Sequence, residues 1–463
     1  MAPRGSIELP GPDSTESYHL TDDEIEDIVE ALDNDYEEVI VASLAALSAA
    51  DIAELLAKIH PEDREKLITN YGVAMPPDMF AELDPELRRM ALSGMNAAQI
   101  AIIIGDMDSD DALYMIEELE PAFQKEIIRH LSARSRITLE EGLAFPEDSA
   151  GRLMQREFVA IPQFWTVGKT IDYLRAAGED LPHEFFDIFV VSPAYRIVGK
   201  IPLNQLIRAQ RPVKLEKLAL DETNPIPATM DQEEVAQIFR RENLVSSPVV
   251  DTDGRLIGVI TVDDVVDVIH EEAAEDILRL AGVEGGDLYR AVLSTTGSRF
   301  RWLFVNLLTA ILASIVISFF DATIEQIVAL AVLMPIVASM GGNAGTQALT
   351  VAVRALATRE LSSANAIRIV WKETLVGALN GAAFAVLMGL IAGLWFHSHV
   401  LGLVIAAAMV LNLVAAGICG AGIPIILHRL GSDPAVSSTV LLTTVTDVIG
   451  FLAFLGLAAL FLV

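Results

Sequence analysis

The 463-residue sequence contains a single cysteine, Cys419, which lies inside an apolar run. A disulfide within the chain and a metal site built from paired cysteines are therefore both excluded. Basic residues are also scarce, with 32 Lys and Arg against 64 Asp and Glu, so the formal net charge at pH 7 is −32. Such an acidic surface excludes a nucleic-acid-binding protein, because phosphate groups require basic surfaces. Residues 1–16 have no apolar core, so we expect no cleavable signal peptide.

The acidic charge is confined to one part of the chain. Residues 300–463 carry six basic and six acidic side chains, so the whole net charge lies in residues 1–299. A chain with 52% hydrophobic residues and a positive mean hydropathy would nevertheless be unusual for a soluble protein. The contrast predicts an acidic soluble part joined to an apolar membrane part, and the length predicts more than one domain.

Five apolar runs in the second part are long enough to cross the hydrocarbon core of a bilayer, which takes roughly 20 residues. The first four contain no Asp, Glu, Lys or Arg. Buried helices of a soluble protein are seldom uncharged over such lengths, so that alternative is disfavoured. We expect transmembrane helices at residues 302–320, 327–353, 374–396, 400–427 and 434–463.

Basic residues in the short connections predict the orientation of these spans. The connection between the second and third spans carries four basic residues, whereas the connection between the first and second carries only Asp321 and Glu325 as charged residues. Basic connections remain on the cytoplasmic side of a membrane. We therefore expect residues 1–299 in the cytoplasm and the C-terminus outside.

Asp447 lies near the middle of the last span. A carboxylate at this depth costs about 2.5–3.5 kcal/mol, and such residues usually face a bundle interior or a water-filled path. We interpret Asp447 as an ion-pathway carboxylate; a protonated or hydrogen-bonded structural Asp is the alternative. Thr439 and Thr443 precede it at intervals of four residues and extend the polar stripe of this helix.

The second span contains a run of small and polar residues after Pro335. Three glycines in the run would permit close backbone approach or local unwinding, and its amide and hydroxyl oxygens suit a hard, hydrated cation. Two of the glycines stand four residues apart, which is equally typical of a helix-packing face. Beside Asp447, the run becomes a candidate pore lining, made of Gly341, Gly342, Asn343, Gly345 and Thr346.

Residues 17–145 have apolar residues at helical spacing and contain a repeat, in which residues 47–56 match residues 95–104. Ser48 and Asn96 each stand where a helix N-cap is expected. Asp51 and Gln99 follow three residues later, as in a capping box. The pattern predicts an all-α domain of stacked helical hairpins.

Residues 146–270 contain a second repeat, in which residues 190–201 match residues 249–260. Each copy has two apolar strands around a turn and then a helix, expected at residues 203–208 and 262–269. Two such copies predict one pseudo-symmetric α+β module. A long helix is expected to run from about Val262 towards Ser298 and to lead into the first span.

Acidic residues recur at helical intervals along the start of this long helix. Like charges at this spacing destabilise a helix by a few tenths of a kcal/mol per pair. The acidic face is either solvated or completed by divalent cations. Its members are Asp264, Asp267, Glu271, Glu272, Glu275 and Asp276.

Four motifs together resemble the MgtE family of bacterial magnesium channels: residues 341–347 (GGNAGTQ), residues 354–360 (RALATRE), the pairs at 433–434 and 446–447, and residues 146–154 (PEDSAGRLM). The resemblance covers residues 20–463 in unbroken order. It implies a multidomain homodimer in the bacterial inner membrane. The implied parts are a flexible arm (1–16), an all-α N-domain (17–145), an α+β pair of cystathionine-β-synthase (CBS) domains (146–270), a connecting plug helix (271–299) and a five-helix transmembrane domain (300–463).

The resemblance also implies roles for single residues. Asp447 matches the family's pore carboxylate, which holds hydrated Mg2+ where the pathways of two subunits meet. The chain departs from familiar members at Thr346 and Thr439, where others have Asn, and at Asn243, where some have an acidic residue. Regulatory Mg2+ is expected at Asp231, Glu233, Asp263, Asp264, Asp267, Glu272, Glu275 and Asp276.

These observations predict a Mg2+-selective channel that admits Mg2+ down its electrochemical gradient and is closed by cytosolic Mg2+. Mg2+ dehydrates reluctantly, so a wide site with two symmetry-related Asp447 carboxylates can hold it through its waters. A channel for Co2+ or another divalent ion, and an adenine nucleotide such as ATP at the CBS pair, remain open alternatives. No enzymatic activity is expected: an intramembrane aspartyl protease needs two carboxylates, and only Asp447 lies within a span. The polar second span disfavours a regulatory sensor without conduction.

Overall fold

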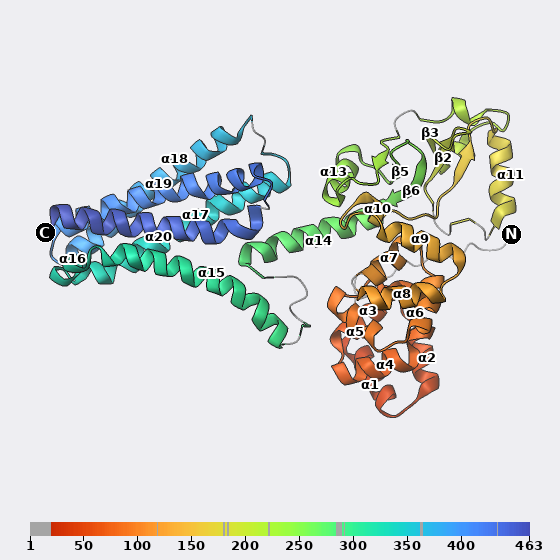
Figure 1. The fold of residues 1–463 in the computed structure, drawn as a ribbon, viewed down its shortest axis with the longest axis horizontal. Coiled ribbons are helices and arrows are strands. Elements are labelled where there is room, and N and C mark those ends of the chain that lie inside the picture. Colours follow the sequence, from red (N-terminus) through yellow and green to blue (C-terminus); the bar gives the residue numbers. More distant parts are fainter. Residues whose placement is uncertain are drawn as a thin grey trace, which may run out of the picture. The chain divides into compact units, whose positions relative to one another are not determined.

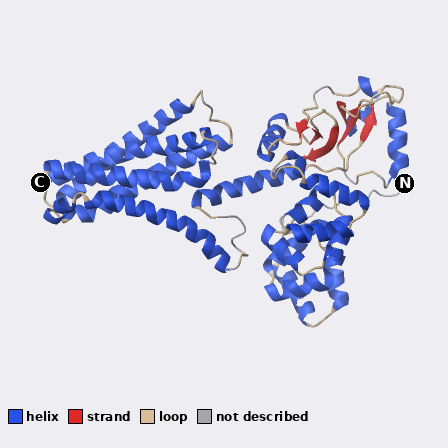
Figure 2. Cartoon of the chain, viewed as in Figure 1, coloured by secondary structure: helices blue, strands red, loops and turns tan. Residues whose placement is uncertain are grey.

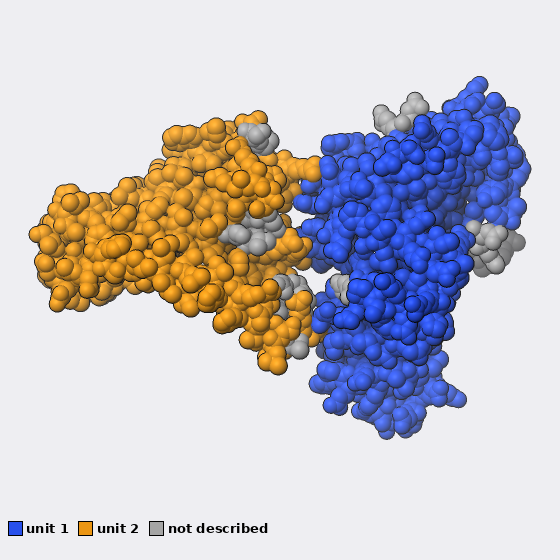
Figure 3. All heavy atoms as spheres, viewed as in Figure 1, with its two compact units in different colours: residues 1–272 blue, residues 273–463 orange. Residues whose placement is uncertain are grey.

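The computed structural model describes residues 20–117, 119–178, 181–182, 185–220, 223–283, 289–290, 292–361, 364–432 and 434–463. The flexible arm predicted at residues 1–16 lies outside the described residues. The chain divides into two compact units, residues 1–272 and 273–463 (Figure 3). The first contains helices and two small sheets, and the described part of the second is helical (Figure 2).

The first unit begins with a series of short helices (Figure 1). Both predicted capping boxes are confirmed: the backbone N–H of Asp51 donates to Ser48 Oγ at 3.1 Å, and that of Gln99 donates to Asn96 Oδ1 at 3.0 Å. The helices are α1 (Asp22–Asp33), α2 (Glu37–Ala46), α3 (Ala49–Lys58), α4 (Pro61–Tyr71), η1 (Gly72–Ala74), η2 (Pro77–Phe80), α5 (Pro85–Ser93), α6 (Ala97–Gly105), α7 (Ser109–Glu117), α8 (Pro121–His130) and α9 (Ala133–Leu143).

Two three-stranded sheets follow, and each has one parallel and one antiparallel pairing. The antiparallel pairs share one register: Val190 faces Gly199, and Val249 faces Gly258. The predicted repeat is thus confirmed to the residue. The elements are α10 (Ala150–Leu153), β1 (Ala160–Pro162), α11 (Val167–Ala177), β2 (Asp187–Val191), β3 (Ile197–Pro202), α12 (Leu203–Arg208), η4 (Leu215–Lys217), β4 (Ile226–Pro227), α13 (Gln232–Glu242), β5 (Ser246–Val250), β6 (Leu256–Thr261) and α14 (Val262–Ala281).

Arg152, in the motif at residues 146–154, ties the α-helical segment to this module. Its Nε donates to the carbonyl oxygen of Phe145 at 3.0 Å and its Nη2 to that of Leu143 at 3.1 Å, which satisfies the C-terminal end of α9. Its Nη1 lies 3.0 Å from a carboxylate oxygen of Glu117 at the end of α7. One guanidinium group therefore fixes two helix ends at the junction.

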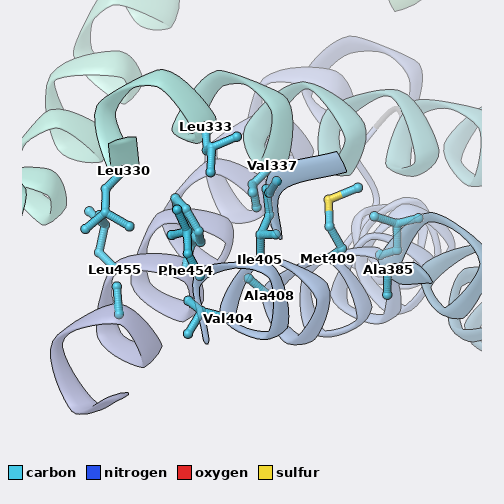
Figure 4. Packing of buried hydrophobic residues seen from close by; sticks show 14 residues of the cluster. Leu330, Leu333, Val337, Ala385, Val404, Ile405, Ala408, Met409, Phe454 and Leu455 are labelled. Atoms are coloured by element: carbon cyan, nitrogen blue, oxygen red, sulfur yellow. The ribbon is translucent and has the colours of Figure 1, made fainter. Parts of the chain in front are cut away.

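The second unit contains α15 (Val292–Ser318), α16 (Asp321–Gln326), α17 (Ala329–Ala357), α18 (Ala366–Trp395), α19 (His399–Arg429) and α20 (Pro434–Phe461). Among the described residues, five of its helices are long and apolar enough to cross a membrane. Helix α19 is the most buried of the five and packs against α17, α18 and α20. Figure 4 shows Leu330 of α17 close to Leu455 of α20, and Val337 of α17 close to Ile405 of α19, within one buried cluster.

The expected continuous helix from about Val262 to Ser298 is wrong. Helix α14 ends at Ala281, and Gly282 follows with a φ of +69°. The N–H of Gly282 donates to the carbonyl oxygen of Arg279, and the N–H of Val283 donates to that of Leu278, both at 3.0 Å. This is a Schellman motif, in which a left-handed glycine terminates a helix. The segment predicted as a plug helix at 271–299 is therefore divided between α14 and α15.

Two spans also begin earlier than predicted, at Val292 instead of residue 302 and at Ala366 instead of residue 374. The added turns contain charged residues such as Arg299 and Arg368. An apolar run indicates only the part of a helix that lies in the hydrocarbon core, and the helix itself can continue into the polar region of the membrane surface. The helices are therefore longer than their apolar runs.

A buried ion pair joins the two copies of the repeat. Lys200 Nζ donates to Asp187 Oδ2 at 2.9 Å and to the carbonyl oxygen of Ser246 at 3.1 Å, and Ser246 Oγ donates to the same carboxylate oxygen at 2.8 Å. Asp187 and Ser246 occupy equivalent positions in the two copies. All three residues are less than a tenth exposed.

Replacing Lys200 with Met should destabilise this module by about 3–5 kcal/mol, because Asp187 would stay buried without its cation. Denaturant unfolding of the purified chain, monitored by near-UV circular dichroism, would measure the loss. The double variant Lys200→Met/Asp187→Leu should recover most of it, since no charge is then left unpaired. A single variant as stable as the parent would contradict this account of the pair.

Candidate permeation pathway and acidic cleft

Helix α17 is continuous through its glycine-rich run, so of the two alternatives the structure favours close approach over local unwinding. Gly341 and Gly345 are buried on the packed side of the helix. A methyl group at Gly341 would collide with the side chain of Asn412, and one at Gly345 would lie 2.9 Å from Leu442 Cδ1. These two glycines pack against neighbouring side chains, as in the helix-packing alternative, and their place in a pore lining stays a prediction. Gly342 is half-buried and has open space beside its Cα.

The polar residues of the run occupy the opposite, exposed side of α17. Asn343 and Thr346 are exposed, and so is Thr443 on α20. The hydroxyl groups of Thr346 and Thr443 donate to carbonyl oxygens four residues earlier in their own helices, both at 2.9 Å. This arrangement leaves hydroxyl lone pairs available to a ligand.

Asp447 lies on α20, half-buried, and forms no hydrogen bond or ion pair with any residue the structure describes. Two contacts show which part of α17 lies beside Asp447. In the first, Gly345 of α17 packs directly against Leu442 of α20. In the second, Asn412 of α19 packs between Gly341 of α17 and Gly450 of α20. Asp447 stands between Leu442 and Gly450, and Asn343 stands between the two glycines of α17. The structure thus brings Asn343 and Asp447 to one level of this helix pair.

Thr439 has a different partner from the one expected for a pore residue. Its Oγ1 donates to the carbonyl oxygen of Leu280, in the last turn of α14, at 3.0 Å. The side chain of Leu280 packs against Leu349 and Leu442. The C-terminal end of α14 is therefore attached to α17 and α20.

An acidic cleft of about 550 Å³ lies in the first unit. Ten carboxylate side chains line it, and Arg152 is the only Lys or Arg among the described lining residues. They come from η2 and the loop after it, from both ends of α7, from residue 148 and from the first turns of α14. The acidic lining residues are Asp78, Glu82, Asp84, Asp110, Asp111, Glu117, Asp148, Asp264, Asp267 and Glu271.

Burial and mutual repulsion raise the pKa values of several of these carboxyl groups. Burial, with the charge of Asp264 as the next cause, raises the pKa of Asp111 to about 7 and that of Asp110 well above its usual range. Burial also raises the pKa of Asp264 to about 6, although the Thr261 hydroxyl donates to it at 2.7 Å and favours the ionised form. The pKa values of Asp267 and Glu82 are raised by burial as well.

Two of the eight predicted regulatory residues, Asp264 and Asp267, line this cleft. Protein partners of the others include the following: Asp231 caps α13 by accepting from the N–H of Glu233 at 2.9 Å, and Glu272 accepts from Gln232 Nε2 at 2.8 Å. Glu275 pairs with Arg279. Asp263 and Asp276 are not among the lining residues.

The cleft carboxylates outside α14 were not predicted. Asp110 and Asp111 stand in the first turn of α7. Acidic residues are common there because their negative charge interacts favourably with the positive end of the helix dipole. The run of four Asp between residues 106 and 111 was the available signal. Among the described residues, no three His, Cys, Asp or Glu side chains already converge on one point as ligands of a bare metal ion.

The fold and the family models that the chain matches define a class of protein, a multi-pass divalent cation transporter with an intracellular N domain and CBS domains. Residues 334–457 match the family model described as divalent cation transporter, residues 47–148 match the MgtE intracellular N domain, and residues 222–271 match the CBS domain. The chain belongs to the MgtE family of magnesium transporters.

Curated relatives support this assignment over most of the chain. The magnesium transporter MgtE of Bacillus subtilis is 30% identical over 90% of this chain and 92% of its own length. That of Thermus thermophilus is 33% identical over 92% of this chain and 99% of its own length.

Two solved structures are similar to about half of the chain. The soluble part of a magnesium transporter is 25% identical and covers 54% of this chain and 98% of its own, with a TM-score of 0.48. The cytosolic domain of the Mg2+ channel MgtE in complex with ATP is 28% identical and covers 53% of this chain and 99% of its own, with a TM-score of 0.49.

The raised pKa values make the stability of the first unit depend on pH. Between about pH 4 and pH 7 the folded cleft binds more protons than the unfolded chain, so stability must fall as pH rises through this window. In EDTA, the unfolding temperature of the first unit should fall by roughly 5 °C or more between pH 5 and pH 8. Differential scanning calorimetry would measure it.

The variant Asp111→Asn should flatten this pH dependence, because it removes a carboxyl group whose pKa lies within this window. Asp27→Asn, at an exposed position of α1, is the matched control and should leave the slope unchanged. A parent protein with equal stability at both pH values would refute the assigned pKa shifts.

Proposed function

We propose that this protein conducts Mg2+ through the bacterial cytoplasmic membrane, down its electrochemical gradient, and that cytosolic Mg2+ closes it. The observation that carries the proposal is Asp447, a carboxylate within a membrane span that is without a cationic partner among the described residues. Membership of a family of magnesium transporters supports Mg2+ as the ion. Residues 1–299 lie in the cytoplasm in this proposal, and the C-terminus lies outside.

The functional form in this proposal is a homodimer with its pathway between two copies of α17 and α20. Asn343, Thr346 and Thr443 are exposed on apolar helices. Lipid offers these groups no hydrogen-bond partner, so they favour contact with water or with another protein surface. A second copy would bring a second Asp447 to the same pathway and enclose these polar groups.

The chemistry of Mg2+ suits such a site. Mg2+ keeps several of its waters and accepts near-octahedral oxygen ligands. Two carboxylates neutralise its charge without stripping its inner waters, while the hydroxyl and amide groups accept or donate at those waters. An inside-negative potential contributes about 4.6 kcal/mol per 100 mV to the entry of a divalent ion, so no ATP hydrolysis is needed.

The acidic cleft is the proposed sensor of cytosolic Mg2+. Its carboxylates repel one another when ionised, and a divalent cation, held through water, would replace that repulsion by attraction. Asp264 and Asp267 stand in the first two turns of α14, and Leu280 stands in its last turn against Thr439. A helix transmits a displacement of one end to the other, so occupation of the cleft would bias the end of α14 that contacts α17 and α20.

Binding of an adenine nucleotide at the CBS pair belongs to the same proposal and is supported by the match to the CBS domain. Co2+ or another divalent cation remains the alternative permeant ion. Flux measurements with each cation would separate the two.

The variant Asp447→Asn should lower Mg2+ influx at least tenfold, because it keeps the size of the side chain and removes the charge that compensates the ion. Influx into proteoliposomes, followed with a trapped Mg2+ indicator, measures the effect. Glu325→Gln, outside the long helices, is the matched control. Undiminished influx through Asp447→Asn would refute the proposed pathway.

The double variant Asp111→Asn/Asp264→Asn should conduct Mg2+ normally but should need a several-fold higher Mg2+ concentration on the cytoplasmic side to close. The reason is that two of the cleft's most strongly perturbed carboxylates can no longer attract the cation. Patch recordings that scan cytoplasmic Mg2+ would show the shift, with Asp27→Asn as the control. If the cytoplasmic Mg2+ concentration needed for closure were unchanged in the variant, the proposed role of the cleft in gating would be refuted.

A further inference from the structure

Asn412 is a polar residue buried in the apolar core of the second unit. It lies on α19 and has no exposed surface. Its Nδ2 donates to the carbonyl oxygen of Val337 on α17 at 2.8 Å. Its Oδ1 is buried and has no hydrogen-bond partner among the described residues.

Two glycines enclose this side chain from neighbouring helices. A methyl group at Gly341 of α17 would collide with Asn412, and one at Gly450 of α20 would lie 2.7 Å from its Nδ2. The contact among Asn412, Val337, Gly341 and Gly450, here called the Asn412 junction, therefore joins three helices at one point. Figure 4 shows Val337 within the packed cluster between α17 and α19.

The Asn412 junction lowers the stability of the fold compared with an apolar contact at the same place. A buried acceptor without a donor costs about 1–3 kcal/mol. A leucine has a similar branched shape and would bury no polar atom, so packing alone does not account for the amide. The carbonyl oxygen of Val337 is held in place by helix α17 and has a second lone pair that can accept the N–H of the Asn412 amide. It therefore fixes the position of that amide.

The position of the junction gives the amide a second role. Gly341 is two residues before Asn343, and Gly450 is three residues after Asp447 on the adjacent turn of α20. The side chain of Asn412 thus sets how closely α17 and α20 approach at the level of the candidate ion ligands. Pro335, which cannot donate a hydrogen bond within α17, lies two residues before the anchored carbonyl.

We propose that Asn412 is a positioning residue for ion selection: it anchors α17 through Val337, separates α17 from α20, and so fixes the spacing of Asn343 and Asp447. This inference rests on the proposed permeation function. Discrimination between Mg2+ and Ca2+ depends on cavity size and rigidity. A loosened junction should therefore admit the larger ion before it abolishes Mg2+ flux.

The test measures the ratio of Mg2+ influx to Ca2+ influx in proteoliposomes, together with the unfolding temperature of the same protein in detergent. Asn412→Leu should lower the ratio by about fivefold or more, while the unfolding temperature is unchanged or higher. Asn380→Leu makes the same replacement at an exposed position of α18 and should leave the ratio unchanged. A purely structural Asn412 would lower the unfolding temperature and leave the ratio intact.

A second pair of variants separates the hydrogen bond from simple packing. Gly450→Ala should lower the ratio, because its methyl group pushes against the amide. Gly450→Ala/Asn412→Ala removes that clash but leaves Val337 without its donor, so the ratio should stay low. Recovery of the parental ratio in this double variant would overturn the anchoring role.

The outcomes also distinguish this inference from the function on which it rests. A parent protein that passes no Mg2+ would refute the proposed function itself. A parent that conducts Mg2+, together with an Asn412→Leu variant of unchanged ratio, would refute only the role of Asn412. An equal loss of selectivity in Asn380→Leu would likewise overturn it, since the effect would then be general to these helices.

Discussion

Carboxylate charge that the chain does not neutralise is the constraint on which the structure depends. In the first unit it accumulates in a cleft that holds ten carboxylates and one arginine, and the cleft raises the pKa of Asp111 to about 7. In the second unit a single Asp447 lies among apolar helices. Both places are unfavourable for the protein alone, and in the proposed function a divalent cation compensates both, as the cargo of one unit and the signal for the other.

The antiparallel strand pair of each copy could be predicted because its information is local, whereas the parallel strands β1 and β4 were not predicted. Each copy of the repeat pairs a valine with a glycine across a turn, and the two registers coincide. The number of spans was also local information, since apolar length decides it. The end of α14 before Gly282 was not predicted, because the acidic periodicity of this segment suggested one continuous helix. Glycine is nevertheless the residue that most often terminates a helix, so Gly282 could have predicted this end.

The sites were harder to predict because they depend on residues distant in sequence. Asp447 was identifiable from its depth alone. The cleft requires residues 78–111 to approach residues 264–271, and no local pattern encodes that approach. Asn412 was overlooked because one amide in a long apolar run has no visible partner; its meaning comes from glycines 71 residues before it and 38 residues after it.

The ion pair of Lys200 has a consequence for the duplicated module. Asp187 in one copy corresponds to Ser246 in the other, and the position of Lys200 corresponds to Val259. Both charges of the pair therefore come from the first copy, whereas the second copy contributes a hydroxyl group and a carbonyl oxygen. The two copies are alike in backbone but unequal in charge, so an acidic residue at position 246 would bury a second carboxylate beside Asp187.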